Sequence, residues 1–140
     1  MHVGAKKEER SRVSFIDFDP AQLTEREDVQ DLSVLWALRE STTVSWVNVV
    51  GLHDTELIER LGERFGLHPL VLEDIAHVGQ RPKLEEYDEY LYIVLYQLEW
   101  HGEHETVAEE QVSLVLGTNW MFSFQEQRGD DFDPTWERLR

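Results

Sequence analysis

Two adjacent carboxylates, Glu73 and Asp74, are the residues of this sequence best placed to bind a ligand. Pro69 precedes them, and because proline suits the first position of a helix, the pair falls in the second half of a short helix. Carboxylates in that half lie near the negative end of the helix dipole, which costs roughly 0.3 kcal/mol or more. No lysine or arginine lies within the helix, and the nearest is Arg81.

A hard divalent cation would compensate this acidic pair, since Mg²⁺ commonly binds one or two carboxylates and keeps several of its waters. A solvated helix face explains the same two residues without any ligand. The residue types and their spacing leave both interpretations open.

The other polar clusters have simpler explanations. Two histidines and two glutamates could hold a transition metal weakly, but they fit a polar hairpin turn: His101, Glu103, His104 and Glu105. Acidic runs also occur within 85–89 and 130–133. They lack the spacing of a metal-binding loop, and we interpret them as a solvated edge and a helix-capping region.

The composition excludes several classes of function. The chain has no phosphate-binding, dinucleotide-binding, hydrolase or zinc-protease motif, so we expect it not to be an enzyme. It has no cysteine, which rules out disulfides, thiolate zinc sites and thiol nucleophiles. A formal net charge of −16 would repel nucleic acid and anionic lipid surfaces and would attract cations.

The elements that position the acidic pair follow from the hydrophobic pattern. β-Branched and aromatic residues predict strands at 13–18 and 42–50, with a short strand near Val29 between them. Asp54 is a good N-cap for a helix that runs to Gly66, with apolar residues at helical spacing. The helix that carries the acidic pair follows and is expected to close at Gly79.

Three strands come next. The segment 90–98 is apolar on both alternating faces, which predicts a strand in the middle of a sheet that is covered on both sides. Turns at 101–103 and 117–119 connect it to strands that end at 116 and 124, as in an antiparallel meander. The order of elements indicates an α/β fold in which a mixed sheet lies between helices, a three-layer αβα sandwich.

We divide the chain into a flexible leader (1–11), a domain (12–132) and the start of a further helix (133–140). Asp133-Pro134 is a strong helix start, and the few residues that follow predict a helix that is cut short. The longest nearly uncharged run, 90–98, is far shorter than the ~20 apolar residues that a spanning helix needs.

A series of motifs resembles the CorA family of magnesium and cobalt transporters. The matching segments are Val44-Ser45-Trp46-Val47-Asn48-Val49, Gly51-Leu52-His53, Phe65 to Ile75, Gln80-Arg81-Pro82-Lys83, Glu110 to Leu114, Phe124-Gln125-Glu126 and Asp131-Phe132-Asp133-Pro134. They occur in the family's order and cover roughly residues 42–140, whereas residues 1–41 match only in general character.

The resemblance implies the N-terminal cytoplasmic domain of a homopentamer in the inner membrane. A stalk helix would continue from Pro134, and two transmembrane helices with a Gly-Met-Asn pore motif would follow it. The acidic pair of the family contributes to cation sites between subunits, where bound Mg²⁺ holds the channel closed. By that resemblance Glu73 and Asp74 are regulatory metal ligands for Mg²⁺ or Co²⁺, and their partner carboxylates would lie downstream.

Other functions remain open at this point. The regulatory domain of a zinc transporter of the ZntB type, from the same superfamily, would have a similar sequence. A stand-alone cytosolic metal-binding or phosphohydrolase-like domain would need convergent ligands or a nucleophile, which the motifs do not supply. A purely structural assembly domain would bind no ion at all.

Overall fold

The computed structural model describes residues 11–126 and residue 138. Within that range the chain forms one seven-stranded mixed sheet of order β2-β1-β3-β7-β6-β5-β4. The β3–β7 pair is parallel and the other pairs are antiparallel. The elements are β1 (Arg12–Phe18), β2 (Leu23–Arg26), α2 (Ser33–Trp36), a 3₁₀ turn (Ala37–Glu40), β3 (Val44–Val50), α3 (Thr55–Phe65), α4 (Pro69–Ala76), β4 (Lys83–Glu86), β5 (Leu91–His101), β6 (Thr106–Leu116) and β7 (Trp120–Gln125).

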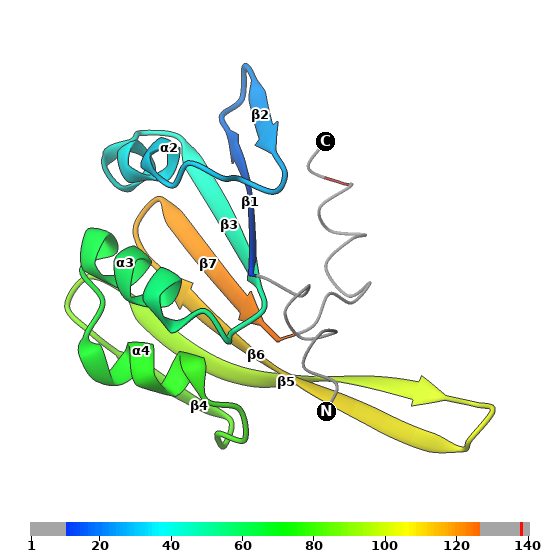
Figure 1. Ribbon diagram of the computed structural model, residues 1–140. Helices are drawn as coiled ribbons and strands as arrows, with labels where there is room; N and C mark the ends of the chain where they lie inside the picture. Colours follow the sequence, from blue (N-terminus) through cyan, green and yellow to red (C-terminus); the bar gives the residue numbers. More distant parts are fainter. Residues whose placement is uncertain (1–10, 127–137, 139–140) are drawn as a thin grey trace.

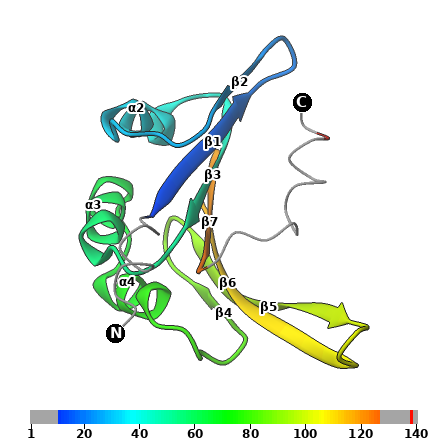
Figure 2. The ribbon, with the colours of Figure 1, turned by 45° about the vertical axis from the view of Figure 1, so that its right-hand side comes forward.

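Helices α2, α3 and α4 all lie on the same face of the sheet (Figures 1 and 2). The core fills the space between them and the central strands. Phe65 of α3 anchors it, because its ring packs edge-on against the rings of Trp120 and Phe122 at centroid distances of 5.1 and 4.7 Å. Val71 and Ile75 bring the fully buried side of α4 into the same core.

The predicted ends of α3 and the predicted start of α4 are confirmed. The carboxylate of Asp54 accepts a hydrogen bond from the backbone N–H of Leu57 at 3.1 Å and begins α3. Gly66 ends it in the left-handed conformation at φ 73°, which glycine adopts without a Cβ clash. Pro69 occupies the first turn of α4, and His68 caps this helix by accepting from the N–H of Leu70 at 3.0 Å.

Strands β5 and β6 continue well beyond their neighbours and form a projecting hairpin (Figure 1). Pairing with β4 stops at Val94, and pairing with β7 stops at Val112. The side chains of Leu98, Trp100 and Val107 on this hairpin are 66%, 63% and 55% exposed. The outer hairpin therefore adds little to the core.

Two predicted boundaries are wrong. The short strand is β2 at Leu23–Arg26, and Val29 instead donates a single backbone hydrogen bond to Val13. Helix α4 ends at Ala76, and Gly79, at φ 92°, lies in the loop beyond it. The loop begins early because His77 leaves the helix in an extended conformation.

The predicted position of the strand at 90–98 is also wrong. β5 lies next to the edge strand β4 and not in the middle of the sheet. Tyr92 and Val94 are buried under the helices, whereas Leu91 and Ile93 on the other face are only half-buried. The apolar residues on both faces of β5 therefore belong to a strand next to the edge of the sheet.

The mixed sheet and the antiparallel β5-β6-β7 meander are confirmed. The leader at 1–11, apart from Ser11, lies outside the described residues. The same holds for the helix expected at 133–140, apart from Arg138. Within residues 11–126 the helices cover one face of the sheet, so a helical layer on the other face stays a prediction.

Candidate functional site

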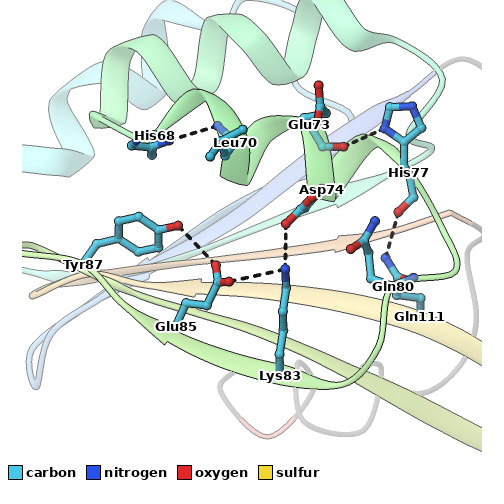
Figure 3. Close-up of polar contacts among 10 residues, drawn as sticks. All are labelled: His68, Leu70, Glu73, Asp74, His77, Gln80, Lys83, Glu85, Tyr87 and Gln111. Atoms are coloured by element: carbon cyan, nitrogen blue, oxygen red, sulfur yellow. Dashed lines mark hydrogen bonds and ion pairs between the residues drawn. The ribbon is translucent and has the colours of Figure 1, made fainter.

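The acidic pair lies in the last turn of α4, and its two side chains point in different directions (Figure 3). Successive residues of an α-helix are rotated by about 100° around its axis. Asp74 consequently points toward the sheet and is half-buried, while Glu73 points away from the sheet and is exposed. The structure therefore does not bring the two carboxylates together on a single ion.

Lys83 neutralises Asp74 from the first position of β4. Its Nζ lies 2.7 Å from Asp74 Oδ2 and 3.5 Å from Glu85 Oε2 (Figure 3). The side chains of Lys83 and Asp74 are only 28% and 26% exposed. The hydrogen bond that Lys83 donates to Asp74 raises the pKa of this lysine, so the ammonium is charged at neutral pH.

This ion pair was not anticipated from the sequence. The helix contains no basic residue, which left a bound cation and a solvated helix face as alternatives. Asp74 instead pairs with Lys83, which lies nine residues later in the chain. Glu73 has no basic partner in the described chain, and its backbone carbonyl accepts a hydrogen bond from His77 Nδ1 at 2.7 Å.

Tyr92 forms the floor beneath this ion pair. Lys83 Nζ lies 5.5 Å from the centre of the tyrosine ring, within the range of a cation–π contact. Burial raises the pKa of Tyr92 to about 12. Its hydroxyl lies near Ser113 but makes no hydrogen bond of normal geometry, so it is a buried polar group without a partner.

Gln111 fixes the loop between α4 and β4. Its Oε1 accepts from the backbone N–H of Gln80 at 2.7 Å, and its Nε2 donates to the carbonyl of His77 at 3.3 Å (Figure 3). Tyr96 adds a hydrogen bond from its hydroxyl to the carbonyl of Gln80 at 2.6 Å. These contacts attach the loop to β5 and β6. They thereby fix the position at which β4 begins with Lys83.

The remaining polar clusters within residues 11–126 form no group that could hold a metal ion, and the acidic run at 130–133 lies outside the described residues. The histidines and glutamates at 101–105 lie at the tip of the projecting hairpin, where His101 pairs with Glu99 at 3.3 Å. Within residues 11–126, no group of three or more His, Asp or Glu side chains could hold a metal ion. Glu73 and Asp74 together could thus provide only part of a ligand set.

Residues 41–139 match the family model of the CorA-like Mg²⁺ transporter protein. This match covers well over half of the chain and contains the helix with the acidic pair. The chain belongs to the CorA family.

A relative in this family gives the same assignment. The cobalt/magnesium transport protein CorA of Thermotoga maritima is 46% identical over 110 residues, which is 79% of this chain and 31% of that protein. The chain therefore spans about a third of the length of this relative. Within residues 11–126, no helix is both long and apolar enough to cross a membrane.

Solved structures of low identity share the fold. The CorA magnesium transporter of Methanocaldococcus jannaschii matches with a TM-score of 0.63 at 10% identity. The match covers 91% of this chain and 36% of the chain of that transporter. The ZntB cytoplasmic domain of Vibrio parahaemolyticus matches with a TM-score of 0.63 at 12% identity. This match covers 90% of this chain and 48% of the chain of that domain. These likenesses confirm the α/β fold of a CorA soluble domain, and they do not distinguish between the ions.

Sequence reasoning missed Lys83 and Gln111 as parts of this site. Both lie inside segments that match CorA motifs, but their roles depend on contacts between distant strands. A local signal existed for Lys83: it stands on the same face of β4 as Glu85, two residues later.

Proposed function

We propose that this chain is the regulatory domain of a CorA-type transporter of divalent cations and that it binds Mg²⁺ or Co²⁺ through Glu73 and Asp74. The observation that carries the proposal is the match of residues 41–139 to the family, with the acidic pair on the accessible last turn of α4. The chain spans about a third of the length of the Thermotoga maritima relative, so we assign transport to a longer protein that would contain this chain.

The longer protein would be a homopentamer in the inner membrane, with this domain on the cytoplasmic side. Carboxylates from neighbouring subunits repel one another, and a divalent ion between them stabilises the closed assembly. Loss of the ion when cellular Mg²⁺ falls would release that packing. The divergence of Glu73 and Asp74 supports an ion shared between subunits, since each carboxylate can face a different neighbour.

The domain would act by binding and not by catalysis. Glu73 offers an open carboxylate to a hydrated ion, and Asp74 offers a second one if it leaves Lys83. The ion would supply positive charge between subunits, which is a structural role.

A second candidate is the regulatory domain of a zinc transporter. The chain shares its fold with the ZntB cytoplasmic domain over 90% of its length, so the fold is compatible with this candidate as well. The two candidates differ in the ion that stabilises the domain, so Mg²⁺, Co²⁺ and Zn²⁺ should be compared side by side.

Thermal unfolding of the 140-residue chain and of the longer protein tests the proposal. A site of millimolar affinity adds about 1.4 kcal/mol of stability at a tenfold excess of ligand over Kd. We expect a small upward shift of Tm with Mg²⁺ in the chain and a larger shift in the longer protein. The double variant Glu73→Ala, Asp74→Ala should lose most of it.

A matched control removes two exposed carboxylates from α3, with Glu59→Ala and Glu63→Ala, and should keep the Mg²⁺ response. If the longer protein shows the same Mg²⁺-induced Tm shift with and without the Glu73→Ala and Asp74→Ala substitutions, the assignment is contradicted. A shift with Zn²⁺ and none with Mg²⁺ or Co²⁺ would favour the ZntB type.

A further inference from the structure

Asp74 is already paired with a positively charged side chain. The ammonium of Lys83 lies 2.7 Å from Asp74 Oδ2 and 3.5 Å from Glu85 Oε2, so one positive charge contacts carboxylates of both α4 and β4. Glu73, one residue earlier, is exposed and has no basic partner in the described chain. The two residues of the acidic pair are therefore unequal: one is open to a cation and the other is already paired.

The sheet register holds Lys83 in this position. Lys83 pairs with Val94 and Glu85 pairs with Tyr92, which directs both side chains toward α4. The ammonium of Lys83 lies over the ring of Tyr92, and Gln111 fixes the preceding loop. The ammonium is thus tethered beside Asp74 by the fold, and its high local concentration favours the ion pair.

We infer that Lys83 is a built-in competitor of the divalent cation and sets the affinity of the acidic pair. This inference rests on the proposed function and deepens it. Glu73 is open to a divalent ion, whereas Asp74 becomes a ligand only when its carboxylate leaves Lys83. An ion that binds Asp74 must therefore displace a tethered ammonium, which lowers the apparent affinity of the ion and raises the concentration at which the domain responds.

The free energy of the ion pair determines by how much Lys83 lowers the affinity for the divalent cation. A partly exposed lysine–carboxylate pair of good geometry lowers the affinity of a competing cation by roughly fivefold. Removal of any nearby positive charge also raises cation affinity, because it removes long-range repulsion of the cation, and that contribution is smaller at a screened surface. The test must separate these two contributions.

The experiment is a Mg²⁺ titration of the 140-residue chain, followed through the backbone amide resonances of Glu73 and Asp74. Lys83→Met keeps the aliphatic stem and removes the ammonium, and we expect its Kd for Mg²⁺ to fall roughly fivefold. Lys83→Arg keeps the competing charge and should bind about as weakly as the wild type. Arg81→Met removes an exposed charge two residues away that makes no ion pair in the described chain, and should change Kd by less than about twofold.

The outcomes separate this inference from the proposed function. Tighter binding in Lys83→Met alone supports both, even if binding to the wild type is too weak to measure. Equal Kd values in the wild type, Lys83→Met and Arg81→Met would overturn the competitor role and leave the acidic pair as a metal site. Absence of binding at α4 in all the variants would overturn both.

A measurement on the unaltered protein covers the case in which Lys83→Met does not fold. The side-chain ammonium resonance of Lys83 reports its ion pair directly. Saturating Mg²⁺ should shift it toward the position of a solvated lysine if the ion displaces it. An unchanged Lys83 resonance, with Mg²⁺ bound at Glu73 and Asp74, would contradict the inference.

Discussion

Gln111 in the middle of β6 accepts a hydrogen bond from the backbone N–H of Gln80 at 2.7 Å, across 31 residues of sequence. This contact holds the loop that leads from the acidic pair to Lys83. Gln111 is 5% exposed, so its loss would leave the N–H of Gln80 without its partner in a site that water reaches poorly.

We expect Gln111→Ala to lower the free energy of unfolding by about 1–3 kcal/mol, because it orphans buried polar groups and removes packing. Gln97→Ala on β5 is a suitable control, since the buried Oε1 of Gln97 has no hydrogen-bond partner. Urea denaturation of both variants measures the difference. Equal stability losses in the two variants would show that the loop does not depend on Gln111.

Gly62 allows α3 and α4 to approach closely. A Cβ at this position would overlap the side chain of Leu72 in α4. We expect Gly62→Ala to destabilise the protein by about 1–3 kcal/mol through overpacking, despite the gain of about 1 kcal/mol in helix propensity. Thermal or urea unfolding measures this change.

A second substitution tests the cause. Leu72→Ala makes room for the new methyl group, so Gly62→Ala should cost clearly less in the Leu72→Ala background than in the wild type. The same cost in both backgrounds would mean that the helix contact is not responsible.

Tyr92 gives the fold a specific sensitivity to alkaline pH. Burial raises the pKa of Tyr92 from 10.0 to about 12. Between these values the unfolded chain loses the phenolic proton while the folded protein keeps it, so the unfolded chain binds fewer protons and stability falls as pH rises. A change of about two pKa units corresponds to roughly 3 kcal/mol at most.

Tyr92→Phe removes this titration. We expect it to change the stability at pH 7 by less than about 1 kcal/mol, since the hydroxyl has no hydrogen-bond partner. Between pH 10 and 12 it should become more stable than the wild type, because the other tyrosines titrate in both proteins and cancel. Parallel loss of stability in the two proteins over this pH range would contradict the account of Tyr92.

Local signals predicted the elements that depend on local chemistry. Asp54, Gly66 and Pro69 fix the ends of α3 and the start of α4 through contacts within a few residues, and each was predicted from its type. The end of α4 was not predicted, because it depends on the extended conformation of His77. That conformation is held by Gln111, whose contact lies 34 residues away.

Contacts between distant strands could not be predicted in this way. The parallel pairing of β3 with β7 places Trp46 beside Met121, although 75 residues separate them. The position of Lys83 depends on the register of β4 against β5, and no hydrophobic pattern specifies that register. The acidic pair was therefore predicted, while the lysine that neutralises half of it was not.

The central claim is that a divalent cation binds at Glu73 and Asp74, and paramagnetic Mn²⁺ tests it most directly. Substoichiometric Mn²⁺ broadens the amide resonances nearest to it, even when binding is weak. We expect the resonances of Glu73 and Asp74 to broaden first, excess Mg²⁺ to restore them, and Glu73→Gln with Asp74→Asn to abolish the effect. Broadening confined to the hairpin tip at 101–105, or spread evenly over the acidic surface, would contradict the claim.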